Sequence, residues 1–236
     1  MKITRLKDHE LLQIISIESR NFIRKCNPDQ TTNQPEPDKK EHYSIESLIA
    51  VSEILSCVDQ LYFSKNMLSG YRKSMLKNKM NRFDYLLFGV ENFYLRLTSV
   101  YERCLKLLNV IYKLELKDRE CRNDIIFKNV KLKDSNLIKI LKHFYKFLSK
   151  YRRVRNVIAH KNSYSDSELH DFEGFYYLIE DDTELEKYKN YFKIRSDEYV
   201  KKKKKQFETN IILIENFIEK ILDELILPYK KTLDSF

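Results

Sequence analysis

The chain has 236 residues, of which 44 are Lys or Arg and 35 are Asp or Glu, so its formal net charge is +9 at pH 7. With 42% hydrophobic residues, this length is enough to bury the core of one domain, or of one domain with an extension. Only 3 glycines are present, and Gly70, Gly89 and Gly174 are isolated from one another. This argues against the glycine-rich phosphate loops of Walker-type and Rossmann-type nucleotide enzymes.

The cysteines and the amino terminus indicate the compartment. Cys26, Cys57, Cys104 and Cys121 form no Cys-x-x-Cys pair and have no His at zinc-ligand spacing, so we expect reduced core thiols, no metal and no cofactor. The first eight residues carry charges where a secretory signal needs an apolar stretch, and no later window approaches eighteen uncharged apolar residues. A soluble, cytoplasmic protein without a membrane segment is expected. Its basic balance favours an acidic partner such as nucleic acid, although a plain solvated surface would give the same balance.

A first helix is predicted from about Asp8 to Lys25, where apolar residues recur at helical spacing. The following stretch, 27–41, contains Pro, Asn and Gln with almost no apolar residue, which is typical of a linker. We therefore divide the chain into residues 1–43, an N-terminal helix with a polar linker, and residues 44–236, a helical bundle.

Four long amphipathic helices are predicted in the second part, because apolar residues repeat there at steps of three and four. The stretch 72–82 is expected to be a loop or a short polar helix, and 175–179 a short strand or a buried loop. The fold class is all-α: an antiparallel four-helix bundle with an additional N-terminal helix and an irregular insertion, 163–195. The predicted helices are 44–67, 83–116, 136–160 and 197–227, the last ending before Pro228.

The residues that could act in catalysis lie at the end of helix 136–160. At about 100° per residue, Arg155 falls within roughly 40° of the centre of the apolar stripe that includes Phe144 and Tyr151. An unpaired charge among apolar neighbours is unfavourable, so the guanidinium needs an acidic partner. We expect a carboxylate from helix 83–116, with Glu91 and Glu102 as candidates, or an anionic ligand such as phosphate.

His160 closes the same helix and lies about 140° around it from Arg155. Asn156 shares the face of His160 and can orient its imidazole by a hydrogen bond. One helix alone does not bring the Arg and His together well, whereas a second copy packed across a two-fold axis would pool two of each in one cleft. The geometry therefore predicts a homodimer.

An Arg and a His in one cleft suit RNA strand cleavage. The imidazole can take the proton of the ribose 2′-hydroxyl or give one to the leaving 5′-oxygen, and the guanidinium can stabilise the phosphorane. No metal is needed, because the nucleophile belongs to the substrate. Neighbouring basic residues could contact the phosphate backbone, or they could simply form the solvent-exposed face of the helix. The RNA-binding candidates are Arg152, Arg153 and Lys161.

Arg155-Asn156-x-x-x-His160 at the end of an amphipathic helix, in an all-helical chain, resembles the HEPN superfamily (higher eukaryotes and prokaryotes nucleotide-binding). Segment 83–116 is also similar to its stand-alone, Cthe-like bacterial branch. The resemblance covers roughly residues 44–227. It implies a dimeric four-helix bundle with a composite, metal-independent endoribonuclease site at the dimer interface, in which Arg155 and His160 are catalytic and Asn156 is the polar residue after the Arg.

The same resemblance implies a setting in toxin–antitoxin, anti-phage or CRISPR-associated systems, with an antitoxin or another defence protein as partner. Two positions depart from the family. Some ribonuclease members have an acidic residue shortly before the Arg, where this chain has Ser149 and Lys150, which leaves Glu102 as a substitute. Toxin members that pair with a nucleotidyltransferase have a Tyr two residues after the His, where this chain has Asn162, and this argues against that branch.

Two alternatives to a nuclease stay open. The protein could be a non-catalytic module that binds RNA, a nucleotide or a protein, or a structural bundle in which Arg155 is salt-bridged within its own chain. The run 201–205 could be an arm for nucleic acid or a self-repelling solvated stretch. No site is assigned to the acidic cluster 180–182. Aromatic residues are expected to pack in the core, and Tyr164 is the one near the motif worth testing.

Overall fold

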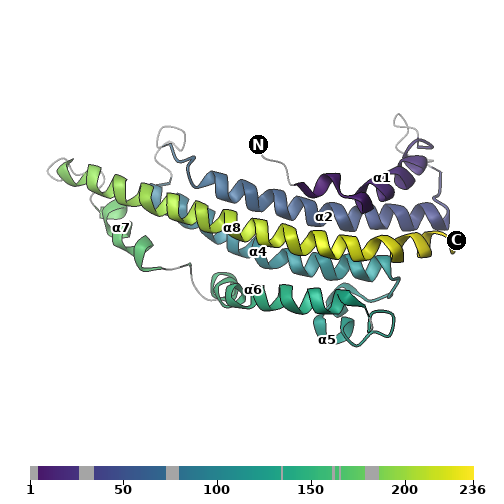
Figure 1. The fold of residues 1–236 in the computed structure, drawn as a ribbon. Coiled ribbons are helices and arrows are strands. Elements are labelled where there is room, and N and C mark those ends of the chain that lie inside the picture. Colours follow the sequence, from purple (N-terminus) through teal and green to yellow (C-terminus); the bar gives the residue numbers. More distant parts are fainter. Residues whose placement is uncertain are drawn as a thin grey trace. The chain divides into compact units, whose positions relative to one another are not determined.

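The computed structural model describes residues 5–26, 35–72, 80–133, 135–160, 163–164, 166–178 and 186–236. Every regular element in these ranges is a helix, which confirms the predicted all-helical class (Figure 1). The elements are η1 (Arg5–Asp8), α1 (Glu10–Ile23), α2 (Lys39–Met67), α4 (Arg82–Ile111), η2 (Asp118–Glu120), α5 (Asn123–Ile126), α6 (Asn136–His160), α7 (Ser167–Leu178) and α8 (Glu186–Leu233). None of the helices in the described ranges combines the length and apolar character needed to cross a lipid bilayer.

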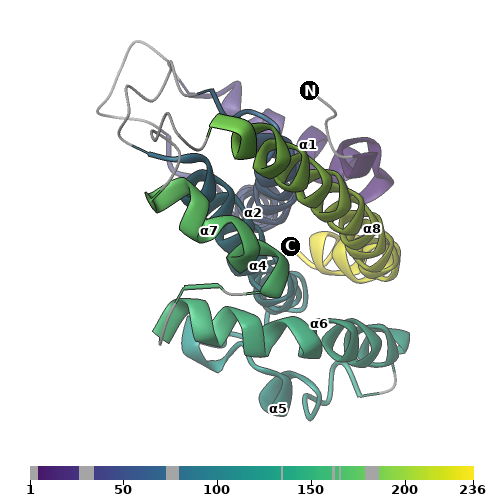
Figure 2. The same cartoon turned by 90° about the vertical axis from the view of Figure 1, so that its left-hand side faces the viewer.

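The chain divides into two compact units, and α2, α4, α6 and α8 each contribute a segment to both. The first unit comprises residues 1–59, 99–147 and 214–236. Its long segments pack antiparallel in chain order: the Tyr43 hydroxyl donates to the Ile111 carbonyl at 3.0 Å, and the Phe144 ring contacts Tyr101 on α4 and stacks on Phe217 of α8. α1 lies against α2 and α8 (Figures 1 and 2), and the Ser19 hydroxyl donates to the Ser44 carbonyl.

The second unit comprises residues 60–98 and 148–213 and contains the Arg155/His160 motif. Phe93 of α4 stacks on Phe207 of α8 with ring centroids 3.6 Å apart, and the Tyr151 hydroxyl of α6 donates to Asn210 of α8 at 2.7 Å. α7 packs on the first turns of α8, where the Phe175 ring stacks on Phe192. The end of α6 is thus held against α8 at Tyr151.

α2 begins at Lys39, five residues before the predicted start at Ser44. Asp38 and Glu41 explain the difference, because each side chain accepts a hydrogen bond from the other's backbone N–H, at 2.8 and 3.2 Å. This reciprocal pairing is a capping box, and it starts the helix inside the stretch that was predicted to be linker.

α4 ends at Ile111 instead of the predicted 116, and it does so without a glycine. Lys113 adopts a positive φ of 46°, and the N–H groups of Lys113 and Leu114 bond back to the carbonyls of Val110 and Asn109. This is the Schellman arrangement, which normally uses Gly at the left-handed position. The side chain of Asn109 exchanges two hydrogen bonds with the backbone of Leu116, which holds the following turn.

α8 is longer than predicted at both ends, and it continues through Pro228. A proline inside a helix removes one backbone hydrogen bond and costs about 3 kcal/mol. Residues beyond it offset that cost, because Tyr229 is fully buried, stacks on Tyr43 at 5.3 Å and donates to the Ser44 hydroxyl. The prediction that the helix stops before Pro228 was wrong for this reason.

The predicted strand or loop at 175–179 was also wrong, since residues up to Leu178 belong to α7. Phe172, Phe175 and Tyr176 are buried at steps of three and four, which is a helical face too short to recognise in the sequence. Ile179 lies outside the described residues, as does most of the basic stretch 72–82.

Candidate functional site

The buried face of α6 ends at Tyr151. Its core residues are Leu137, Ile138, Leu141, Phe144, Leu148 and Tyr151. From Arg152 to His160 no residue is buried, and Val154, Val157 and Ile158 are each half-buried. The last two and a half turns of the helix therefore carry apolar side chains that their own chain covers only in part.

Arg155 lies in this partly covered segment and is half-buried. Its Nη1 donates to Oδ1 of the adjacent Asn156 at 3.2 Å, and no carboxylate in the described part of the chain pairs with it. The Glu91 carboxylate instead accepts the backbone N–H of Tyr164 at 2.7 Å, and Glu102 is exposed in the first unit. The carboxylate partner expected from helix 83–116 is therefore not found, and Arg155 is only half-buried because the apolar stripe loses its cover before it reaches this residue.

His160 is exposed as the last residue of α6, and it makes no hydrogen bond to any described residue. The amide of Asn156 is engaged by Arg155 and does not orient the imidazole. Within one chain, no hydrogen bond joins the Arg155 and His160 side chains.

The basic candidates around the motif differ in exposure. Arg153 is exposed and Arg152 is half-buried. Lys150 lies over the ring of Tyr151, with its ammonium 4.7 Å from the ring centroid. Lys161 lies outside the described residues, as do the acidic residues 180–182.

A cluster that the sequence reasoning missed follows directly after α6. Lys203 of α8 is only 8% exposed, and its ammonium lies 2.8 Å from Oδ2 of Asp166 and donates to the Tyr164 hydroxyl at 2.9 Å. The same ammonium lies 5.3 Å from the ring centroids of Tyr164 and Tyr199. Asp166 also caps α7, since its Oδ1 accepts the Leu169 N–H at 2.8 Å.

The protonation equilibria of this cluster reflect its burial. Burial alone would raise the pKa of Asp166, but hydrogen bonds from Lys203 and Tyr164 outweigh it and lower the pKa below the usual 3.8. Burial raises the pKa of the Tyr164 and Tyr199 hydroxyls, and the nearby Asp166 raises it further. At neutral pH the Asp166 carboxylate is thus charged, and the hydroxyls of Tyr164 and Tyr199 beside it are neutral. Tyr164, the aromatic residue near the motif that the sequence suggested testing, belongs to this cluster.

The sequence did contain a signal for Lys203. Val200, Lys203, Phe207, Ile211 and Ile214 recur at steps of three and four along one face of α8, and the four apolar residues are buried. Lys203 is thus a charge on an apolar stripe, the feature that drew attention to Arg155. Lys203 was not recognised in the sequence because it lies in a run of five consecutive lysines, 201–205.

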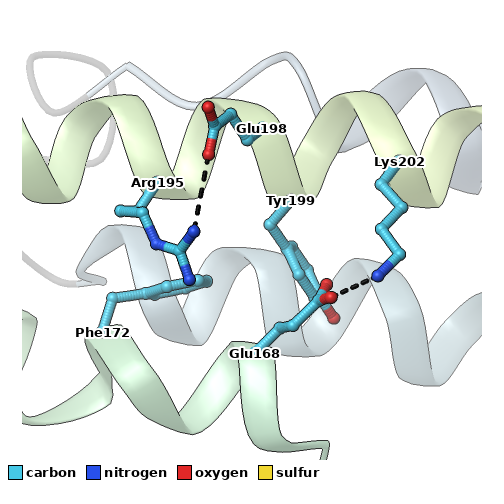
Figure 3. Close-up of a pocket in the computed structure, with 6 residues that line it drawn as sticks. All are labelled: Glu168, Phe172, Arg195, Glu198, Tyr199 and Lys202. Carbon is cyan, nitrogen blue, oxygen red and sulfur yellow. Dashed lines mark hydrogen bonds and ion pairs between the residues drawn. The ribbon is translucent and has the colours of Figure 1, made fainter.

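A hollow between α7 and α8 is lined by Glu168, Phe172, Arg195, Glu198, Tyr199 and Lys202 (Figure 3). Its charges are balanced, because Lys202 pairs with Glu168 and Arg195 pairs with Glu198 at 3.6 Å. Phe172 and Tyr199 are almost completely buried, so their rings offer little open surface. This hollow is therefore a poor site for phosphate or for a stacked base. Among the described residues, no three His, Cys, Asp or Glu side chains gather as ligands for a metal.

Comparison with known families agrees with the helical fold. The family described as Cthe2314-like HEPN matches residues 43–225, which is more than half of the chain and includes Arg155 and His160. No curated protein and no solved structure matches the chain significantly. The chain belongs to the Cthe2314-like HEPN family.

Proposed function

We propose that this protein is a metal-independent endoribonuclease whose site forms when two copies bring their Arg155 and His160 side chains into one cleft. The observation that supports the proposal is the incomplete burial of the last turns of α6. A half-buried Arg without a carboxylate partner in the described residues lies there beside apolar side chains that the chain covers only in part. A second copy would cover those side chains, and an RNA phosphate would pair with the guanidinium.

The chemistry follows from the two residue types. The imidazole of His160 takes the proton of a ribose 2′-hydroxyl, whose oxygen then attacks the adjacent phosphorus. The guanidinium of Arg155 stabilises the extra negative charge of the phosphorane. The 5′-oxygen leaves and takes up the proton that the His160 imidazolium now carries, so the product ends in a 2′,3′-cyclic phosphate. The nucleophile is part of the substrate, so this route needs no metal-bound water.

Contacts close to the motif in sequence support the proposal. The Glu91 carboxylate holds the backbone of Tyr164, and Lys203 holds the carboxylate of Asp166. Exposed Arg153 is available to contact a phosphate backbone without disturbing the fold. The setting that the family implies is toxin–antitoxin or anti-phage defence, with an antitoxin or another defence protein as partner.

The test is cleavage of a labelled single-stranded RNA in EDTA. Wild-type protein is expected to cut the RNA and leave 2′,3′-cyclic phosphate ends, and His160→Ala and Arg155→Ala are each expected to lose at least about a hundredfold in rate. Lys220→Ala, which changes an exposed lysine elsewhere on α8, serves as the matched control. Cleavage by His160→Ala at the wild-type rate would falsify the proposal, as would cleavage of the all-deoxy analogue.

A second function is favoured by one observation. Asn156 is bonded to Arg155 and not to His160, and no acidic residue stands at 149 or 150. A site with this arrangement would bind RNA or a nucleotide without turnover. Salt-dependent RNA affinity that is unchanged in His160→Ala, together with no cleavage by the wild type, would support this binding module.

A further inference from the structure

The first turns of α8 present an exposed face that the Arg155/His160 site does not use. One row of this face, at helical steps of three and four, consists of Lys187, Tyr191, Ile194, Glu198, Lys201 and Lys205, and every member is exposed. A second row beside it, at steps of seven, consists of Tyr188, Arg195 and Lys202, all exposed. We call these two rows the outer face of α8; they span about 27 Å of helix.

The outer face combines cations with partly exposed aromatic rings, although the Tyr191 ring contacts Phe192 edge-on. Tyr188 and Tyr191 are 44% and 57% exposed, and Ile194 is 50% exposed. Elsewhere in α8, the tyrosines Tyr199 and Tyr229 are buried, so the two exposed rings are not part of the core. Large aromatic side chains left open to solvent on a charged helix indicate a contact surface.

The charge of the outer face is strongly one-sided. Five of its residues are basic and only Glu198 is acidic. Arg195 is neutralised by Asp171 and Glu198, and Lys202 by Glu168 (Figure 3). Lys201 and Lys205 have no acidic partner among the described residues. Lys187 places its ammonium 5.1 Å from the centroid of the Tyr188 ring and has no carboxylate partner within the described ranges.

We infer that the outer face of α8 binds single-stranded RNA. Unpaired bases stack on exposed aromatic rings while lysines track the phosphates, which is how sequence-tolerant single-strand sites are built. A duplex hides the faces of its bases and gains only from the cations. An acidic protein would use the cations but has no need of two open tyrosine rings. The choice of RNA rests on the proposed function, and the face would guide the strand independently of its cleavage.

Binding can be measured without cleavage by using the His160→Ala protein and a fluorescein-labelled, unstructured 12-nucleotide RNA in an anisotropy titration. The double variant Tyr188→Ala/Tyr191→Ala, made in this background, is expected to bind at least about tenfold more weakly. Tyr188→Phe/Tyr191→Phe keeps both rings and is expected to retain the affinity. Phe88→Ala removes an aromatic ring that is 50% exposed on α4 and is the matched control.

The charged part of the face is tested by the salt dependence of binding. Lys201→Ala/Lys205→Ala is expected to reduce the slope of log K against log salt by about 1.4, because each phosphate contact on a single strand contributes about 0.7. Lys220→Ala/Lys231→Ala removes two exposed lysines from the other part of α8 and is expected to leave the slope unchanged. Unlabelled single-stranded RNA is expected to displace the probe far better than a duplex or polyglutamate.

Three results would overturn the inference: wild-type-like affinity in the Tyr188→Ala/Tyr191→Ala variant, an equal loss in Phe88→Ala, or displacement of the probe by polyglutamate as effective as by RNA. The last would assign the face to an acidic protein partner. Failure of this inference is distinguishable from failure of the proposed function. RNA cleavage that does not depend on the outer face removes only the inference, whereas RNA binding through this face without any cleavage removes only the nuclease.

Discussion

The ammonium of Lys203 lies 2.8 Å from Oδ2 of Asp166, and this pair of a buried lysine and a half-buried aspartate ties the residue before α7 to the middle of α8. Asp166 also caps α7, and Tyr164, two residues before it, bonds to the same ammonium. One ion pair thus fixes the start of α7 and the position of the Tyr164 hydroxyl. Because the charges of this pair are also hydrogen-bonded, removing one of them is expected to lower the stability of the whole unit.

Lys203→Met is expected to destabilise the protein by about 2 kcal/mol, because it leaves the half-buried Asp166 carboxylate without its cation. Met has nearly the length of Lys, so packing is largely kept. The free energy of unfolding from urea denaturation checks this value. Lys205→Met removes an exposed lysine with no acidic partner among the described residues and is expected to change stability by less than about 0.5 kcal/mol. Equal effects of the two variants would contradict the account.

Acid should weaken the same pair. The pKa of Asp166 is lowered in the folded protein, so its contribution to stability is complete above the usual value of 3.8 and is lost as the pH falls through the lower folded value. Asp166→Asn keeps an acceptor for capping α7 but removes this charge. Thermal melting between pH 7 and pH 2.5 is expected to show a lower Tm for Asp166→Asn at pH 7 and a smaller loss of Tm in acid. Parallel curves for both proteins would show that Asp166 is not the titrating group.

Pro228→Ala is expected to stabilise the protein by roughly 1–2 kcal/mol. The substitution restores a backbone N–H inside α8, and part of the gain is offset by the greater freedom of the unfolded chain. Urea denaturation measures the change. A loss of stability would instead mean that Pro228 sets the helix path that buries Tyr229 against Tyr43.

The partly covered end of α6 gives a prediction about assembly. Ile158→Glu is expected to convert a dimer into a monomer without unfolding it, because Ile158 is half-buried in the single chain and would be buried by a second copy. Light scattering coupled to gel filtration measures the mass. Ile212→Glu, at a position 46% exposed on α8, is the control and is expected to leave the mass unchanged. A wild-type monomer at micromolar concentration would contradict the dimer.

The fold class could be predicted because four long apolar stripes dominate the sequence, and α6 matched its predicted bounds. The end of α2 at Met67 was also predicted, and the start of α4 was predicted to within one residue, whereas the start of α2, the end of α4 and both ends of α8 could not be placed, since they depend on side-chain contacts. Asp38 and Glu41 start α2 inside an apparently polar linker, and Lys113 ends α4 at a position where the sequence has no glycine. Pro228 was read as a stop because the contacts of Tyr229 are tertiary and leave no local pattern.

The candidate site was predictable in composition but not in geometry. The position of Arg155 on the apolar stripe is a property of sequence, whereas its half-burial depends on where the neighbouring elements end. The partner of Glu91 is a backbone N–H that no spacing rule reveals. Lys203 shows that a charge on an apolar stripe can indicate structural support, which leaves the role of Arg155 to be settled by activity.

The central claim is that Arg155 and His160 from two copies act in one cleft, and mixing inactive variants tests it most directly. Arg155→Ala and His160→Ala are unfolded, refolded together and assayed for cleavage of labelled RNA in EDTA, with each variant treated alone as the control. The account predicts that the mixture regains cleavage with 2′,3′-cyclic phosphate ends, because a mixed dimer holds one Arg and one His across its interface. A mixture that contains mixed dimers but stays as inactive as the separate variants would contradict it.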